Sequence, residues 1–276
     1  MGRVLSVCNQ KGGTGKTTSA VNISAYMALA GKKVLLIDLD PQANATSGLG
    51  IDKHAIHKST YHVLLEEMSL AEITLPSSIP GLFIAPSNLD LTGAEVELVG
   101  AMGREYRLKR ALAEEKAKYD FVIIDSPPSL GLLTINSLAS ADALLIPVQC
   151  EYYALEGLTQ LLNTISLVKN NLNPNLTVEG AILTMADFRT NLSREVIKEV
   201  KEHFKDKVFD TIIPRSIRLS EAPSYGKPIP LYDRNNIGAT KYEELTKEII
   251  NAHSEMSKSP EPKLDISQAQ NSESGQ

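Results

Sequence analysis

The chain lacks the features that mark several large classes of protein. It has two cysteines among 276 residues and no apolar run close to the roughly 18 residues that a membrane-spanning helix needs. Cys8 and Cys150 lie far apart and form neither a C-x-x-C pair nor a disulfide framework, so we expect both to be small core residues in a reducing cytoplasm. The histidines do not fall at metal-ligand spacing either. These absences exclude a disulfide scaffold and a protein that spans a membrane.

An excess of positive charge is also missing. The chain carries 28 Lys and Arg against 33 Asp and Glu, which gives a net charge of −5. The overall charge therefore does not indicate nucleic-acid binding, and any nucleic-acid site has to be a local basic patch. The opening residues enter a strand-like run at once and do not form a secretory leader, so we expect a soluble, cytoplasmic protein with no membrane partner.

Short apolar runs rich in β-branched residues alternate with helical patterns along the chain. Several runs are apolar at nearly every position, as expected of parallel strands that are covered on both faces. The predicted strands lie at residues 3–7, 33–40, 82–86, 121–128, 143–149, 179–185 and 208–214. The alternation predicts an α/β fold: a doubly wound, mostly parallel sheet with helices on both faces.

Two helical patterns are especially clear. The first begins near residue 17 and stops at Gly31, and its inward positions are Val21, Ile23, Met27 and Leu29. The second covers 193–204 and places on one face Val196, Ile197, Val200 and Phe204. We predict a single domain over residues 1–252, followed at 253–276 by a polar, disordered tail. A membrane anchor is the alternative for the tail, but the apolar face that such a helix needs is missing.

The stretch "NQKGGTGKTT" at 9–18 follows the first strand-like run and opens a helix, which is the context of a phosphate-binding loop. Its glycines allow positive φ and let backbone N–H groups surround phosphate oxygens, beside the positive end of the helix dipole. Lys16 is expected to reach the β- and γ-phosphates, the Thr17 hydroxyl to ligate Mg²⁺, and Thr18 to contact the α-phosphate. The predicted phosphate-binding residues are Gly12, Gly13, Thr14, Gly15, Lys16, Thr17 and Thr18. A glycine-rich turn without a ligand explains the glycines but not the Gly-Lys-Thr-Thr sequence.

A second lysine breaks the usual G-x-x-x-x-G-K-[ST] pattern of such loops. Gln10 stands where the first glycine belongs, and Lys11 lies inside the loop. Because Lys16 already faces the triphosphate, another ammonium from the same subunit would be repelled. One solution is that Lys11 points at the triphosphate of a second, face-to-face subunit, in the manner of an arginine finger supplied in trans. A solvated lysine at the rim of the loop is the alternative interpretation.

Three aspartates end strand-like runs. Asp38 and Asp40 lie two residues apart in "VLLIDLDPQ", so their side chains point the same way, and Asp125 ends "FVIID". Open α/β sheets bind ligands at the carboxyl ends of their strands, and a magnesium ion there would offset the repulsion between the carboxylates. We predict that all three surround the metal, although an aspartate at a strand end is also a common turn residue.

Basic residues are in modest surplus near the end of the predicted domain. Between 189 and 218 there are eight Lys and Arg against five acids. Many of these charges alternate as Glu and Lys neighbours on the helix at 193–204, which is typical of a solvated helix face. The composition leaves open whether the segment binds a polyanion.

Several motifs, in order, resemble one family. "KGGTGKTT" is similar to the deviant Walker A motif, K-G-G-x-G-K-[ST], of the ParA/MinD ATPases. "VLLIDLDPQANATSGLGI" resembles the next motif of the ParA/Soj branch, "FVIIDSPPSLG" resembles its Walker B motif, and "IPRSIRLSEAPSYGKPI" resembles its C-terminal part. The likeness covers about residues 2 to 250. It implies a P-loop NTPase fold of the deviant Walker A type that binds ATP and Mg²⁺.

The resemblance also implies roles for individual residues. Lys11 is the trans residue and is catalytic together with Lys16 and with Asp40, which positions the attacking water. The implied metal residues are Thr17, Asp38, Asp40 and Asp125, the last through water. The implied adenosine contacts are Met185, Pro214 and Arg215, with Glu151 directed at the partner's ribose. Arg189 and Arg218 are the implied DNA contacts, with weaker contributions from Lys198, Lys201 and Lys227.

As a function, the resemblance implies ATP-dependent DNA segregation. ATP closes a homodimer, the dimer binds double-stranded DNA of the nucleoid without sequence preference, and a ParB-type partner stimulates hydrolysis to ADP and phosphate. A MinD-like ATPase that positions the division site at the membrane is the main alternative, and it needs the C-terminal anchor that we do not find. A relative of nitrogenase iron protein would need bridging cysteines, and a small-molecule ligase is disfavoured by the ParA-like C-terminal half.

Overall fold

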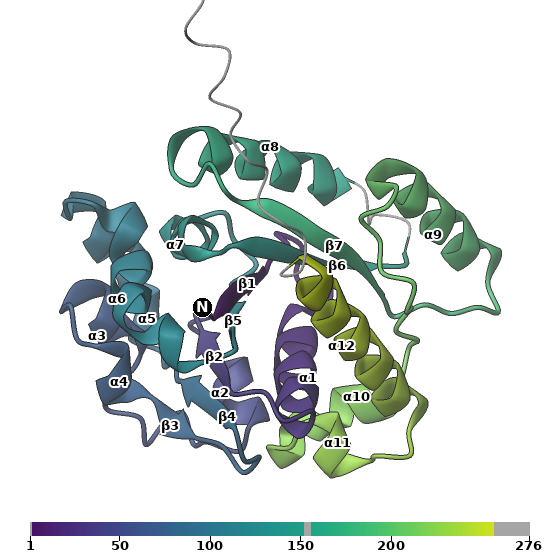
Figure 1. Ribbon diagram of the computed structural model, residues 1–276, viewed down its shortest axis with the longest axis horizontal. Helices are drawn as coiled ribbons and strands as arrows, with labels where there is room; N and C mark the ends of the chain where they lie inside the picture. The colour runs from purple at the N-terminus through teal and green to yellow at the C-terminus, as the bar shows by residue number, and fades with distance from the viewer. Residues whose placement is uncertain (1, 152–155, 257–276) are drawn as a thin grey trace, which may run out of the picture.

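A computed structural model describes residues 2–151 and 156–256 of the chain. Its centre is a seven-stranded sheet with the order β3-β4-β2-β5-β1-β6-β7, parallel except for β3, which pairs antiparallel with β4 (Figure 1). The strands are β1 (Arg3–Val7), β2 (Val34–Asp38), β3 (Leu75–Pro76), β4 (Leu82–Ala85), β5 (Phe121–Asp125), β6 (Ala143–Gln149) and β7 (Thr177–Thr184). The mostly parallel α/β sheet predicted from the alternating pattern is confirmed.

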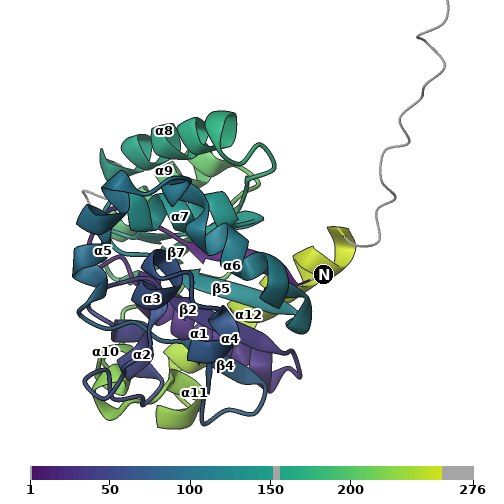
Figure 2. The same ribbon diagram turned by 90° about the vertical axis from the view of Figure 1, so that its left-hand side faces the viewer.

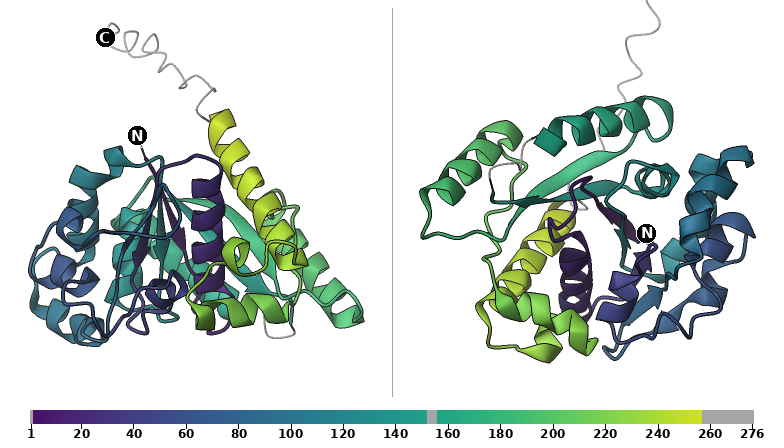
Figure 3. Two further views of the ribbon diagram at one scale, coloured as in Figure 1. Left: turned by 90° about the horizontal axis from the view of Figure 1, so that it is seen from below. Right: turned by 180° about the vertical axis from the view of Figure 1, so that it is seen from behind.

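Helices cover both faces of the sheet (Figures 2 and 3). One face carries α1 (Lys16–Leu29), α2 (Asn44–Gly48), α10 (Ile217–Glu221), α11 (Ile229–Tyr232) and α12 (Ile237–Met256). The other face carries α3 (Thr60–Leu65), α4 (Leu70–Ile73), α5 (Leu91–Glu97), α6 (Arg107–Glu115), α7 (Leu132–Ser140), α8 (Glu156–Asn171) and α9 (Asn191–Phe204). Short 3₁₀ segments are η1 (Leu98–Gly100), η2 (Arg104–Tyr106), η3 (Lys116–Lys118) and η5 (Ala222–Tyr225).

Each face of the sheet has its own hydrophobic core. Every residue of β1, β2 and β5 is buried, which explains why these strands are apolar almost throughout instead of alternating. Cys8 and Cys150 are both free and buried, as we expected of small core residues. Because the central strands are locked between two packed layers, their carboxyl ends are held rigidly at one edge of the sheet.

The seventh predicted strand, at 208–214, does not form. Two isolated bridges, at Val208 and at Pro214, connect this segment to the chain around β7, and the Ile213 N–H donates to the Leu183 carbonyl at 2.9 Å. Between the bridges, the backbone N–H groups of Asp210 and Thr211 donate to the Glu248 carboxylate on α12, at 2.9 and 3.0 Å. The segment therefore runs beside β7 without a continuous ladder, because a side chain takes the donors at its centre.

Helix α1 also corrects one prediction. Val21, Ile23 and Met27 are buried as expected, and Gly31 follows the helix with a φ of 82°, but Leu29 is 54% exposed. Leu29 lies in the last turn of the helix, and its neighbour Ala28 takes the buried position there. At the other end of the chain, residues 253–256 belong to α12 and not to the expected tail, and 257–276 lie outside the described residues.

Candidate nucleotide-binding site

The loop between β1 and α1 occupies residues 8–15, at the carboxyl edge of the sheet. Gly13 and Gly15 have φ values of 75° and 88°, a left-handed conformation that only glycine adopts without strain. The buried Asn9 holds the loop in place, because its Nδ2 donates to the Pro147 carbonyl at 2.7 Å and its Oδ1 accepts from the Lys11 N–H at 3.0 Å. Sequence reasoning missed Asn9, whose only signal is a polar side chain directly after a buried strand.

The two lysines of the loop have different surroundings. Lys16 is buried, and its Nζ donates to the Lys11 carbonyl at 3.0 Å. Burial lowers the pKa of the Lys16 ammonium, while the nearby Asp125 carboxylate opposes that shift. The Lys11 side chain is half-buried at the rim, and no carboxylate of the described residues pairs with its ammonium. Lys16 therefore faces inward to the loop, whereas the charge of Lys11 is left for another group to neutralise.

Strand register brings Asp38 and Asp125 side by side. The two residues are directly paired at the ends of β2 and β5, and both are fully buried. Asp38 accepts hydrogen bonds from the Asp40 N–H at 3.1 Å, from the Thr46 N–H at 2.8 Å and from the Thr46 hydroxyl at 2.7 Å. Burial raises the pKa of Asp38 to about 6 even though these bonds lower it. With its oxygens already occupied by protein donors, Asp38 organises the loop that carries Asp40.

Asp125 is satisfied far less well. Both of its carboxylate oxygens are buried without a hydrogen-bond partner among the described residues. Burial raises the pKa of Asp125 well above its usual range and repulsion from Asp38 raises it further, although the nearby Thr17 hydroxyl and Lys16 ammonium lower it. An orphaned buried carboxylate is costly unless a cation or a donor compensates it. Its environment fits a magnesium ion with its water shell, held between Asp125 and the Thr17 hydroxyl at the start of α1.

The expected metal residues do not form a metal cage by themselves. In the parts of the chain that the structure describes, no group of three or more His, Cys, Asp or Glu side chains is arranged to hold a metal ion. Magnesium keeps several waters and is usually bound by one or two carboxylates together with substrate phosphates. The residues at this edge therefore fit a magnesium ion that binds together with a nucleotide.

A cavity of about 120 Å³ continues from the loop along α1. Its walls include Gly15 and Thr18 of the loop region, and it brings together the three residues expected at adenosine, Met185, Pro214 and Arg215. Met185 has a φ of 53°, an unusual backbone conformation that is frequent at ligand sites. The cavity also contains two residues that sequence reasoning missed, Ser216 and Tyr242. Glu151 forms an ion pair with Arg215 at the rim.

The two expected DNA contacts are both exposed and both paired. Arg189, just before α9, makes a bidentate hydrogen bond to Asp187, which holds the pKa of that carboxyl down to about 2. Arg218, on α10, donates to Glu221 at 3.0 Å and lies 3.5 Å from Asp233. The acids offset part of each positive charge, so phosphate binding has to compete with these ion pairs.

The fold and the loop together define a P-loop NTPase of the deviant Walker A type. The family model described as an AAA domain matches residues 2–178. The chain is 55% identical to the sporulation initiation inhibitor protein Soj of Bacillus subtilis over 249 residues, covering 90% of this chain and 98% of that protein. It is 52% identical to the chromosome partitioning protein ParA of Myxococcus xanthus, covering 91% and 88%. The protein belongs to the ParA/Soj family of chromosome-partitioning ATPases.

A solved structure gives the same fold. The cobyrinic acid a,c-diamide synthase of Mycobacterium smegmatis, crystallised with ADP and magnesium, superimposes with a TM-score of 0.83 at 39% identity, covering 94% of this chain and 98% of that one. The P-loop fold predicted from the sequence is thereby confirmed. Over residues 2–151 and 156–256, no helix is both long and apolar enough to cross a bilayer.

Proposed function

We propose that this protein is an ATP-dependent DNA-segregation protein. In this proposal two copies bind ATP and Mg²⁺ and close into a sandwich, the dimer binds nucleoid DNA without sequence preference, and a ParB-type centromere-binding protein stimulates hydrolysis. The observation that carries the proposal is the buried Lys16 beside the orphaned Asp125 at the start of α1. A buried ammonium close to an unsatisfied carboxylate that ends β5 is an arrangement that a Mg–triphosphate would complete.

Transfer of the γ-phosphoryl group to water requires positioning and charge neutralisation more than covalent chemistry. Lys16 stabilises charge on the β- and γ-phosphates, and Thr18 contacts the α-phosphate. Thr17 and Asp125 would hold the magnesium ion, which would supply positive charge to the phosphate oxygens. Asp40 orients the attacking water, and Asp38 supports Asp40 through the N–H hydrogen bond at 3.1 Å.

The unpaired charge of Lys11 supports a role for the second copy. At the loop rim its ammonium has no acidic neighbour among the described residues, so a triphosphate on a facing subunit would supply the missing negative charge. Binding energy from the γ-phosphate then favours the closed dimer, and hydrolysis removes that bias. In this proposal Glu151, which pairs with Arg215 of the nucleoside cavity, contacts the partner's ribose.

The central experiment follows oligomeric state and turnover together. Wild-type protein with ATP and Mg²⁺ is expected to sediment as a dimer and to return to a monomer as ATP is consumed. When Mg²⁺ is removed by chelation, the protein is expected to stay a monomer and to release no phosphate. Analytical ultracentrifugation and phosphate release measure the two quantities. A monomer at saturating ATP and Mg²⁺ would contradict the proposal.

Removal of Arg218 is expected to weaken DNA binding uniformly across sequences. Arg218→Ala in the ATP-bound dimer loses one phosphate contact per subunit, so the slope of log K against log salt falls by about two for the dimer. Fluorescence anisotropy with two unrelated 30-base-pair duplexes measures this, and Arg189→Ala is expected to act in the same direction. Lys169→Ala, which removes an exposed charge from α8, is the matched control. Equal affinity of Arg218→Ala and wild type at every salt concentration would remove this residue from the DNA site.

One relative favours a second candidate function. The Mycobacterium smegmatis neighbour is named for the synthesis of a cobyrinic acid diamide, so a small-molecule amidation on the same fold is the competing proposal. The relatives named for partitioning are more similar, at 52–55% identity against 39%. The two proposals separate when ATP turnover is measured with duplex DNA and with cobyrinic acid plus glutamine, because only the true substrate or effector should accelerate it.

A further inference from the structure

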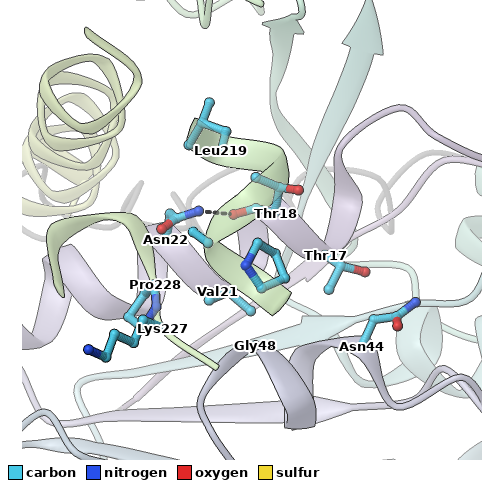
Figure 4. Close-up of a pocket in the computed structure, with 11 residues that line it drawn as sticks. Thr17, Thr18, Val21, Asn22, Asn44, Gly48, Leu219, Lys227 and Pro228 are labelled. Atoms are coloured by element: carbon cyan, nitrogen blue, oxygen red, sulfur yellow. Dashed lines mark hydrogen bonds between the residues drawn. The ribbon is translucent and has the colours of Figure 1, made fainter. Parts of the chain in front are cut away.

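Asn22 links the first turn of α1 to a distant part of the chain. Its side chain is 4% exposed and lies one turn after Thr18. The Nδ2 group donates to the Thr18 carbonyl at 2.8 Å (Figure 4), and the Oδ1 atom accepts from the Ile229 N–H at 2.7 Å. Since one neighbour can only accept and the other can only donate, the orientation of the amide is fixed.

The far end of this link is the segment that carries Arg218. Ile229 is fully buried at the first position of α11, where a helix leaves its N–H without a partner, and Asn22 supplies that partner. The end of α11 returns to α10, because the Tyr232 hydroxyl donates to Glu221, the same carboxylate that pairs with Arg218. The chain 217–233 is thus one hydrogen-bonded unit that is attached to α1 through an amide.

A cavity separates the same two elements. It measures about 220 Å³ and lies between the first turn of α1, represented by Thr17 and Thr18, and a wall that includes Leu219 and Lys227 (Figure 4). Beside the cavity the two elements share a hydrophobic core, which includes Val21 of α1 and Leu219 of α10. The hydrogen-bonded connection between them passes through the Asn22 amide.

A second contact joins the arginine segment to the loop after Asp40. Gly50, just beyond α2, touches Gly226 through the backbone, and a Cβ added to Gly226 would lie 2.7 Å from the Cα of Gly50. Both glycines have positive φ values, 80° and 61°. Residues 217–233 are therefore in contact on one side with Gly50, in the loop after α2, and on the other side with α1.

We propose that Asn22 is a positioning residue that couples nucleotide binding at the first turn of α1 to the conformation of residues 217–233. The proposal rests on the nucleotide site proposed above. Phosphate contacts to Thr17 and Thr18 move or rigidify the first turn of α1. The change in this turn alters the position of the Asn22 amide through its bond to the Thr18 carbonyl. The amide in turn repositions Ile229, and with it the hydrogen-bonded unit that contains Arg218. Coupling of this kind needs a contiguous physical connection, which the two hydrogen bonds provide.

The variant Asn22→Ser cuts the link at a single place. A serine hydroxyl on a helix donates to the carbonyl four residues earlier, as Ser47 does here to Ala43, so the bond to Thr18 is kept while the bond to Ile229 is lost. The matched control is Asn173→Ser. Asn173 lies in the turn that follows α8 and is also buried. Its amide donates to the carbonyls of Leu138 and Ala141.

Hydrogen exchange measured by mass spectrometry tests the coupling, with and without a non-hydrolysable ATP analogue and Mg²⁺. In wild type and in Asn173→Ser, the analogue is expected to slow amide exchange within 217–233 by about fivefold or more, the lower end of typical coupling. In Asn22→Ser the slowing is expected to fall below about twofold, although a fluorescent nucleotide still binds. Slowing in Asn22→Ser that equals wild type, or no slowing in wild type, overturns the proposal. DNA binding by the same proteins is a separate arm, so that loss of DNA binding with intact exchange coupling would count against the proposed function alone.

Discussion

Lys11→Ala is expected to bind ATP normally and to remain a monomer. The residue lies at the rim of the phosphate loop, with its ammonium unpaired among the described residues, whereas Lys16 is buried and faces inward. The alanine keeps the Lys11 backbone N–H and carbonyl, which are the groups that Asn9 and Lys16 use to shape the loop. Only the charge that would cross to the other subunit is removed. ATP hydrolysis is expected to fall by about 10³–10⁵-fold, the range known for a charged residue supplied in trans.

Sedimentation with ATP and Mg²⁺ measures dimerisation, and a fluorescent ATP analogue measures nucleotide affinity in the same samples. Lys169→Ala again serves as the control for the loss of one surface charge. If Lys11→Ala forms the ATP dimer with wild-type affinity, the solvated-lysine interpretation is correct and the trans role fails.

The sequence predicted the parts of the site that depend on chain-local chemistry. The positive φ of Gly13 and Gly15 and the positions of Asp38 and Asp125 at strand ends follow from residue type and from position relative to a strand, whereas Asp40 lies in the loop beyond the end of β2. Strand register, which sets Asp38 directly beside Asp125, follows from the parallel order of the sheet. Met185 and Pro214, which only the family resemblance implied at adenosine, line one cavity, and their contact with a nucleotide stays a prediction.

Contacts between distant segments could not be predicted. The strand expected at 208–214 is interrupted where Glu248, on a distant helix, accepts from the N–H groups of Asp210 and Thr211. Asp38 organises a loop because the N–H and the hydroxyl of Thr46 donate to its carboxylate, and no local pattern marks Thr46 as its partner. Asn22 resembles any polar residue of a helix until Ile229 is placed beside it. In each case the deciding hydrogen bond depends on tertiary packing, which periodicity does not encode.

Asp40→Ala is expected to trap the ATP-bound dimer. Asp40 is 7% exposed, and its Oδ1 accepts from the Gln42 N–H at 2.9 Å, while no described residue donates to its other oxygen. Removing it leaves Asp38 to hold Thr46 and the loop, and it relieves repulsion on Asp125. Folding and ATP binding should therefore persist. Hydrolysis is expected to fall by about 10²–10⁴-fold, as for loss of a positioned base.

The measurement for Asp40→Ala is the lifetime of the dimer after excess nucleotide is removed by gel filtration. The wild-type dimer is expected to decay as its ATP is hydrolysed, and the variant dimer to survive with ATP still bound, identified by chromatography of the extracted nucleotide. Asp52→Ala removes an exposed carboxylate twelve residues away and is expected to decay like wild type. A monomeric Asp40→Ala protein would assign the carboxylate to dimer formation instead of hydrolysis.

Mixing the two inactive variants separates a trans lysine from a cis lysine. In a heterodimer of Lys11→Ala with Asp40→Ala, the nucleotide on the Lys11→Ala subunit keeps its own Lys16 and Asp40 and receives Lys11 from the partner. One composite site is then complete, and the other lacks both groups. If Lys11 acts across the interface, an equimolar mixture is expected to recover part of the wild-type rate, at most about half, because each heterodimer has one complete site of two and keeps one crossing Lys11 to hold it closed. If Lys11 acts on its own subunit's nucleotide, no combination of subunits contains a complete site and the mixture stays inactive.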